Sequence, residues 1–149
     1  GFHEAGDIIG LALAEEYPYS AEGVTPVRLR RLSRAQLDKI TEASPQLRAN
    51  LFSLAARELA AAQRQILLLG RKTARERLCS FLVERQRGDS GTIELPMSRT
   101  DIADYLGLTI ETVSRILSQL RAEGLIRMPT LHSLELADAD RLGDLAEAA

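Results

Sequence analysis

The pattern of apolar and polar residues is strand-like near the start of the chain and helical over most of the rest. The segment that begins at Gly6 looks like a strand ending at Gly10, and 12–17 could form a helical turn. Apolar residues alternate with polar ones in 24–32, as in a half-buried strand with one irregularity. A short helix over 33–40 follows, with Ser33 as its N-cap. Because a few such strands cannot form an independent sheet domain, we expect residues 1–45 to be the end of a larger domain.

The longest helical pattern runs from Gln46 to about Leu69, without glycine or proline. Ser44 is expected to cap this helix and Pro45 to take its first position. Apolar residues spaced alternately three and four apart form a heptad seam: Phe52, Ala55, Leu59, Ala62, Ile66 and Leu69. The helix could simply pack on its own domain. Small residues at two seam positions would also let two helices approach closely, so we predict a symmetric homodimer.

Shorter elements are expected beyond Gly70, which should end the long helix. Thr73 can cap a further helix, whose apolar stripe is Ala74, Leu78, Phe81 and Leu82. A loop over 86–91 and a strand over 92–97 follow. The pattern of 138–149 predicts a short last helix with Leu142 and Leu145 facing inward.

Residues 98–125 have the pattern of a helix-turn-helix. Ser98 and Asp101 have the spacing of a capping box, and the inward face of the first helix is Ile102, Ala103 and Leu106. Gly107 tolerates the positive φ that a sharp corner requires. The second helix places its inward residues at helical spacing: Val113, Ile116, Leu117 and Leu120.

The expected fold class is α+β. Residues 125–127 and 134–136 can pair as a hairpin, and a helix-turn-helix followed by a hairpin is a winged helix. The chain is therefore expected to contain the end of a domain (1–45), a dimerisation helix (46–70) and a winged helix-turn-helix DNA-binding domain (71–149).

Charge and composition narrow the class of protein. The net charge of −2 argues mildly against nucleic-acid binding, but six basic and two acidic residues lie between Arg71 and Arg87. That cluster is either a solvated helix face or part of a DNA-binding surface. No apolar run approaches a membrane span, and the chain begins without the features of a signal peptide. Cys79 is the only cysteine. We therefore expect a cytoplasmic protein without a disulfide or membrane partner.

Side chains at the start of the second helix are suited to reading DNA bases. Arg115 can donate two hydrogen bonds to guanine, and Glu111 can accept one from cytosine. Ile110 could contact a thymine methyl group, and Ser114 could bond to a base or orient Arg115. Glu111 and Arg115 lie four residues apart and can pair, which by itself would be an ordinary surface ion pair. Candidates for contacts to the DNA backbone are Ser98, Arg99, Thr100, Thr109 and Thr112.

The stretch from Asp101 to Arg115 resembles the recognition signature of the CRP/FNR family of bacterial regulators. Residues 67–78 are similar to that family's junction between the dimer helix and the DNA-binding domain. Glu111, Ser114 and Arg115 resemble the FNR and FixK branch, because the cyclic-AMP branch would have an arginine in place of Ile110. The resemblance implies recognition of TTGA-type inverted repeats, contact with RNA polymerase, and activation in response to oxygen limitation or to redox or nitrogen status. It also implies that residues 1–45 are the last part of a β-roll sensor domain.

Residues that this family uses to bind effectors are missing. Leu11 stands where the cyclic-AMP binders have a glutamate, and Tyr19-Ser20 align with their phosphate-binding Arg-Ser pair. Arg30 lies near the position of an expected cluster-binding cysteine of FNR, and one cysteine cannot hold an iron–sulfur cluster. Haem ligation through His3 or His132 is disfavoured against a structural or solvated histidine. We expect no cofactor.

Cys79 lies among apolar residues, so we expect a buried, inert thiol rather than a redox sensor. No phosphate-binding loop, metal-ligand cluster or catalytic serine or cysteine is recognisable, and we expect neither a catalytic nor a metal site. Two alternatives to DNA binding stay open. One is small-molecule sensing, and the other is a winged helix that binds protein, which would have a neutral or apolar outer face on its second helix.

Overall fold

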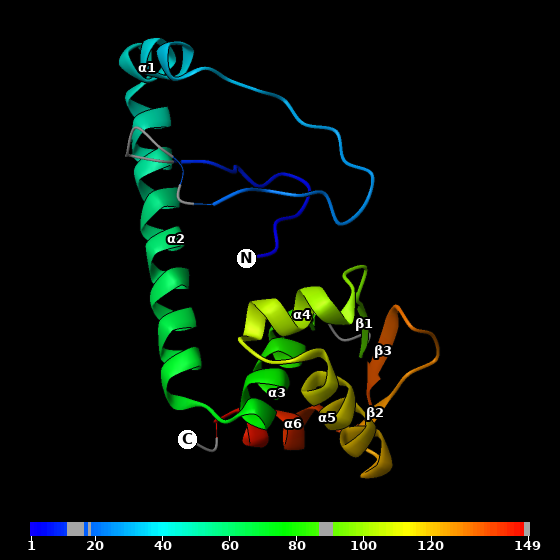
Figure 1. The fold of residues 1–149 in the computed structure, drawn as a ribbon. Helices are drawn as coiled ribbons and strands as arrows, with labels where there is room; N and C mark the ends of the chain where they lie inside the picture. Colours follow the sequence, from blue (N-terminus) through cyan, green and yellow to red (C-terminus); the bar gives the residue numbers. More distant parts are fainter. Residues whose placement is uncertain (12–16, 18, 87–90, 148–149) are drawn as a thin grey trace. The chain divides into compact units, whose positions relative to one another are not determined.

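The computed structural model describes residues 1–11, 17, 19–86 and 91–147, and these form two compact units, Gly1–Gln65 and Ile66–Ala149 (Figure 1). The helices and the small antiparallel sheet confirm the α+β class. The predicted helical turn at 12–17 and most of the predicted loop at 86–91 lie outside the described residues.

The first unit contains α1 (Arg34–Ala43) and most of α2 (Pro45–Arg71). The predicted cap of α1 is confirmed, because the Ser33 side chain accepts from the backbone N–H of Gln36 and the Gln36 side chain accepts from that of Ser33. Ser44 also acts as predicted, since its Oγ accepts a 3.3 Å hydrogen bond from the backbone N–H of Leu47.

The strands predicted at 6–10 and 24–32 are wrong: neither segment forms a strand. Alternating apolar residues specify a strand only where a neighbouring strand pairs with it and a core covers one face. Here no paired strand accompanies them within the described part of the chain, and Val27 and Leu29 are 63% and 71% exposed. The assignment of residues 1–45 to a β-roll domain stays a prediction.

Helix α2 continues through Gly70, where it was expected to end. A glycine inside a helix costs only about 0.5–1 kcal/mol. The backbone N–H of Lys72 still bonds to the carbonyl of Leu68, so the helical pattern persists. The larger side chains of the predicted seam are exposed to solvent in the single chain: Phe52 by 77%, Leu59 by 61% and Ile66 by 70%.

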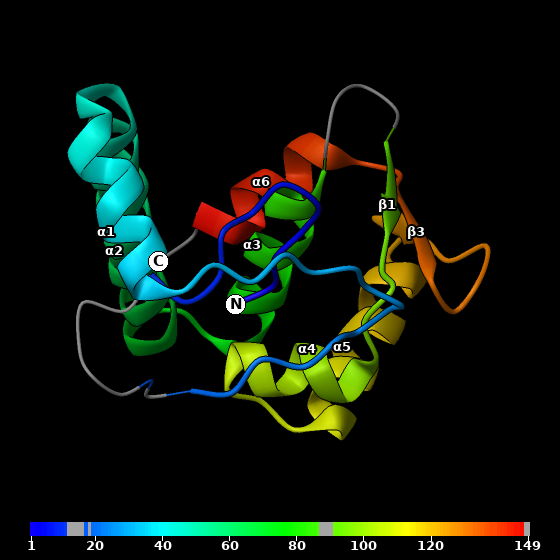
Figure 2. The same cartoon turned by 90° about the horizontal axis from the view of Figure 1, so that it is seen from above.

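The second unit begins its core with α3 (Ala74–Arg85), which packs against α6 (Ala139–Glu147) and contacts α4 (Arg99–Leu106) and α5 (Ile110–Ala122) (Figure 2). Thr73 and Glu76 form the predicted cap of α3 as a capping box. Three members of the predicted apolar stripe are buried: Leu78, Phe81 and Leu82. The fourth, Ala74, is half-buried.

A three-stranded antiparallel sheet completes this unit, in the order β1 (Thr92–Glu94), β3 (Ser133–Leu136), β2 (Ile126–Arg127). The predicted hairpin is confirmed, with Ile126 opposite Leu136. The strand predicted at 92–97 is shorter than expected, because Pro96 lacks a backbone N–H and cannot donate to a ladder. It also pairs with β3, which the sequence pattern did not predict.

The C-terminal end of α6 is anchored to Lys72, just before α3, and to Ser80 in the middle of α3. Lys72 Nζ and Ser80 Oγ both donate to the carbonyl oxygen of Ala146, and Lys72 Nζ also lies 2.8 Å from Ser80 Oγ. A cation at a helix C-terminus is favourable because the last carbonyls carry partial negative charge. Leu142 faces inward as predicted, whereas Leu145 is only half-buried and Ala146 takes the inner position.

Candidate nucleic-acid interface

Helix α4 begins with the capping box that the sequence predicts. The backbone N–H of Asp101 donates to Ser98 Oγ at 3.1 Å, and Asp101 Oδ2 accepts from Ser98 Oγ at 2.6 Å and from its backbone N–H at 2.7 Å. These two hydrogen bonds from Ser98 hold the pKa of Asp101 below its ordinary value. The predicted inward face of α4 is fully buried: Ile102, Ala103 and Leu106.

Gly107 makes the corner between α4 and α5. Its φ of 61° and ψ of 43° lie in the left-handed region, as the sequence predicts. The backbone N–H of Leu108 then bonds to the carbonyl of Ala103 at 2.9 Å, which closes the end of α4. Thr109 caps the next helix by accepting from the backbone N–H of Thr112 at 3.3 Å.

Helix α5 divides into a buried and an open face. Its predicted inner residues are between 0% and 3% exposed: Val113, Ile116, Leu117 and Leu120. On the other side Glu111 and Arg115 are exposed, and Ile110 is 42% exposed. The structure thus brings three of the four predicted base-reading residues to the surface of one short helix.

Ser114, the fourth of these residues, is half-buried and engaged by α4. Arg99 Nη1 donates to Ser114 Oγ at 3.1 Å. Among the described residues, no hydrogen bond joins Ser114 to Arg115, so this structure does not show Ser114 orienting Arg115. The suggested pair of Glu111 and Arg115 is also not formed, since no ion pair joins these two described residues. Neighbouring positions on an exposed helix permit such a pair, but side-chain entropy and hydration oppose it.

Glu111 is instead held at the N-terminus of its own helix. Hydrogen bonds from its own backbone N–H and from the Thr109 hydroxyl lower the pKa of Glu111. A glutamate is anionic at neutral pH in any case, and an anionic Glu111 can accept from a cytosine amino group.

The residues predicted to contact the DNA backbone surround the starts of α4 and α5. Ser98, Thr100 and Thr109 are exposed, whereas Arg99 and Thr112 are half-buried. The hydroxyls of Ser98 and Thr109 already cap helices α4 and α5, and the Thr112 hydroxyl lies 3.2 Å from that of Thr109. Their role as phosphate contacts stays a prediction.

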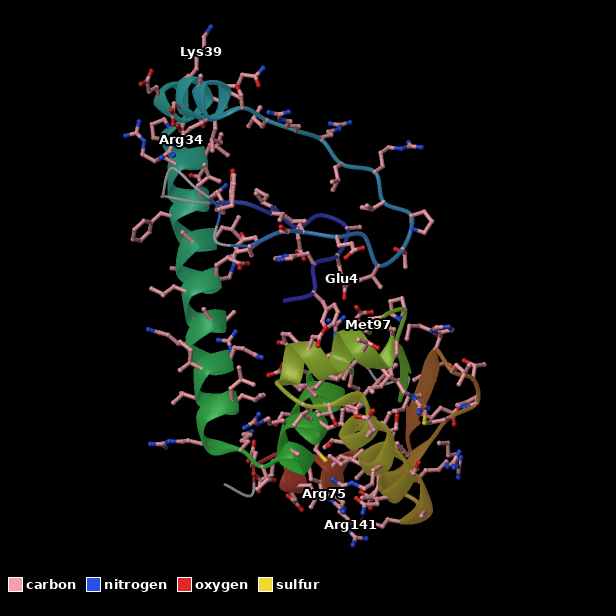
Figure 3. All side chains as sticks on the ribbon, in the orientation of Figure 1. Glu4, Arg34, Lys39, Arg75, Met97 and Arg141 are labelled. Atoms are coloured by element: carbon pink, nitrogen blue, oxygen red, sulfur yellow. The ribbon has the colours of Figure 1, made fainter. Side chains whose placement is uncertain are left out.

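A bidentate ion pair fixes the far end of α5. Arg75 Nη1 and Nη2 lie 2.9 and 2.6 Å from the two carboxylate oxygens of Glu123. Arg75 and Arg141 lie at the same end of this unit (Figure 3). The hydrogen bond from Arg75 is the main cause that lowers the pKa of Glu123. Cys79 lies buried nearby, and burial raises the pKa of its thiol, as expected of an unreactive side chain.

Two features of this face were missed by sequence reasoning. Ser118 is exposed three residues after Arg115, and its Oγ donates to the carbonyl of Ser114. The spacing of three residues between Arg115 and Ser118 could have indicated that Ser118 lies on the exposed side of the helix. The contact of Arg99 with Ser114 joins residues fifteen apart across two helices, and no local pattern signals it.

Over 1–11, 17, 19–86 and 91–147, no group of three or more His, Cys, Asp or Glu side chains is placed to hold a metal ion. Within the same ranges, no helix has both the length and the apolar character required to cross a membrane.

The chain is similar to a known domain family and to known regulatory proteins. Residues 76–145 match the Crp-like helix-turn-helix domain. The chain is 44% identical over 144 residues to the nitrogen fixation regulation protein FixK of Azorhizobium caulinodans, which covers 92% of this chain and 58% of that protein. It is 40% identical over 134 residues to the transcriptional activator protein Anr of Pseudomonas aeruginosa, covering 85% of this chain and 55% of Anr.

Among solved structures, FixK2 from Bradyrhizobium japonicum is similar with a TM-score of 0.74 at 44% identity, covering 79% of this chain and 61% of that one. The chain therefore spans less than two thirds of the length of these relatives.

Proposed function

Because the chain belongs to the CRP/FNR family of transcription regulators and is FixK-like, we propose that it binds DNA as a sequence-specific activator. The open face of α5 is the observation that carries this proposal. It presents a guanidinium, a carboxylate held in its anionic form and an aliphatic side chain: Arg115, Glu111 and Ile110. These are the groups that recognise guanine, cytosine and a thymine methyl in the major groove. We propose TTGA-type half-sites as their target.

The bond between Arg99 and Ser114 gives Ser114 a defined role in that target. A guanidinium donates and cannot accept, so Ser114 Oγ must be the acceptor from Arg99. The hydroxyl proton of Ser114 is then left to donate to an acceptor on the DNA. In the major groove these acceptors are guanine N7 and O6, adenine N7 and thymine O4. Ser114 Oγ also keeps a second lone pair, so the bond from Arg99 leaves it able both to donate to a base and to accept from one.

A homodimer would supply the second recognition helix. Five residues of the predicted heptad seam are exposed and Ala55 is half-buried, and pairing would remove the exposed ones from water: Phe52, Leu59, Ala62, Ile66 and Leu69. Two recognition helices about 34 Å apart, one turn of DNA, would then face successive major grooves of an inverted repeat.

Further parts of the proposal rest on the relatives alone. The name of Anr describes a transcriptional activator, and that of FixK a nitrogen fixation regulator. By analogy we propose activation through contact with RNA polymerase in the cytoplasm, under oxygen limitation or a redox or nitrogen signal, with residues 1–45 belonging to the sensor domain. Regulators of this family are not enzymes, and we assign no catalytic residue.

The test is fluorescence anisotropy with duplexes that carry a TTGA inverted repeat or a scrambled sequence, at one fixed salt concentration. Arg115→Ala should weaken specific binding by roughly 1–3 kcal/mol per half-site and relax discrimination at one guanine. Arg121→Ala is the matched control, because Arg121 is an exposed arginine in the last turn of α5, more than one helical turn along the helix from Arg115. Equal binding of both duplexes by the wild type would refute TTGA-type half-sites as the target, and no binding of either duplex would favour a protein-binding winged helix or a small-molecule sensor.

A further inference from the structure

Arg77 on α3 joins two helix ends in the unit Ile66–Ala149. Its Nη2 donates to the carbonyl of Leu69 at 2.7 Å, and its Nε to the carbonyl of Lys72 at 2.9 Å, both at the end of α2. Its Nη1 donates to the carbonyl of Leu106 at 3.1 Å, in the last turn of α4. One side chain thus connects the end of the predicted dimer helix with the helix that braces the recognition helix.

The chemistry of the site suits an arginine. The last carbonyls of a helix have no partner within the helix and carry the negative end of its dipole. Two such ends converge on Arg77, and the planar guanidinium offers donors in three directions at once. A lysine presents a single ammonium group and cannot match this geometry.

A second contact lies beside this clamp. A Cβ built on Gly107 would be 3.4 Å from Leu69 Cδ2 and 3.5 Å from Arg77 Nη1, so the side chains of Leu69 and Arg77 meet at the corner of the helix-turn-helix. Leu69 is also the last residue of the predicted seam, and it is only 37% exposed, less than Phe52, Leu59 or Ile66. The seam therefore ends directly on the turn that precedes α5.

We infer that Arg77 is a positioning residue that sets the spacing of half-sites that the protein accepts. This rests on the proposed function, in which a dimer reads an inverted repeat. Inserting one base pair between half-sites displaces one of them by about 3.4 Å and rotates it by about 35°. A junction with three charge-assisted hydrogen bonds resists the corresponding movement of α4 and α5 against the end of α2.

The experiment measures binding of the full chain to a series of inverted repeats whose spacers differ by single base pairs. Arg77→Met should reduce the preference for the best spacer over its neighbours by roughly tenfold, because hydrogen bonds to a charged group are lost. Arg77→Lys should give an intermediate preference, and it also serves as the variant to measure if Arg77→Met does not fold. Arg71→Met is the control, since Arg71 is an exposed arginine at the same junction.

A second readout separates positioning from folding. Binding to a duplex with a single half-site should keep its base discrimination in the Arg77 variants, because the outer face of α5 is unchanged. Wild-type spacer preference in folded Arg77→Met and Arg77→Lys would overturn the inference while leaving DNA binding intact. Absence of specific binding by the wild type would instead refute the proposed function on which the inference rests.

Discussion

Replacing Gly107 by alanine tests whether the corner of the helix-turn-helix depends on backbone conformation. The φ of 61° at Gly107 is one that residues with a side chain rarely adopt. Space is not the obstacle, because the nearest atoms to a new Cβ would be 3.4 and 3.5 Å away, at ordinary contact distance. The cost of Gly107→Ala is therefore that of a left-handed residue, about 1–2 kcal/mol of unfolding free energy.

Gly143→Ala is the matched control for this substitution. Gly143 lies within α6 without a positive φ, and a Cβ there would meet nothing within 4 Å. Alanine should stabilise this helix by about 0.5–1 kcal/mol, since glycine loses more backbone freedom on folding. The same chemical change is thus expected to have opposite signs at two positions of one unit.

Amide hydrogen exchange of buried α5 residues such as Val113 and Leu120 is the suitable assay, because it reports opening of Ile66–Ala149 by itself. Exchange should accelerate in Gly107→Ala and slow in Gly143→Ala. Unchanged or slower exchange in Gly107→Ala would refute the argument that positive φ makes glycine necessary here. Loss of stability in both variants would show that the added methyl group, rather than the backbone angle, is responsible.

Two further predictions concern association and pH. Ile66→Glu should convert the predicted dimer into a monomer in sedimentation velocity, because it places a charge in the seam, where Ile66 is 70% exposed in the single chain. A dimer that persists would contradict this seam. The control is Arg64→Glu, at an exposed position outside the seam, which should leave the dimer intact. Glu123 has a lowered pKa, chiefly through its hydrogen bond from Arg75, so its contribution to stability is present above its ordinary pKa of 4.5 and is lost as the pH falls through its lower folded value. Glu123→Gln should therefore be less stable than wild type near neutral pH in urea unfolding, and this difference should disappear in acid; a difference that is independent of pH would contradict a role for the charge.

Features that depend on near neighbours in sequence could be predicted. The caps at Ser33, Thr73 and Ser98 each use a side chain three residues further on, so the residue types alone reveal them. The corner at Gly107 and the buried face of α5 follow in the same way from one glycine and a helical period. The outer face of α5 was predictable because it is what the buried face leaves open.

Features that depend on distant partners could not be predicted. The alternation in 24–32 is the same whether or not a neighbouring strand exists, so the sequence could not show that this segment forms none. Arg99 and Ser114 meet across two helices, fifteen residues apart in sequence, so no local pattern reveals their hydrogen bond. Arg77 looked like one member of a basic cluster, yet its three acceptors are helix-end carbonyls that become neighbours only after folding.

The anchoring of α6 on Lys72 and Ser80 has a consequence for synthesis on the ribosome. Lys72, which lies between α2 and α3, and its acceptor at Ala146 in α6 are separated by 74 positions, so residues near both ends of this unit are in contact. At 5–20 residues per second, roughly 4 to 15 s pass between the synthesis of the two partners. During that interval the face of α3 that α6 later covers has no partner. The nascent unit therefore completes its core only after α6 has left the exit tunnel, and a stalled chain should present that apolar face to chaperones.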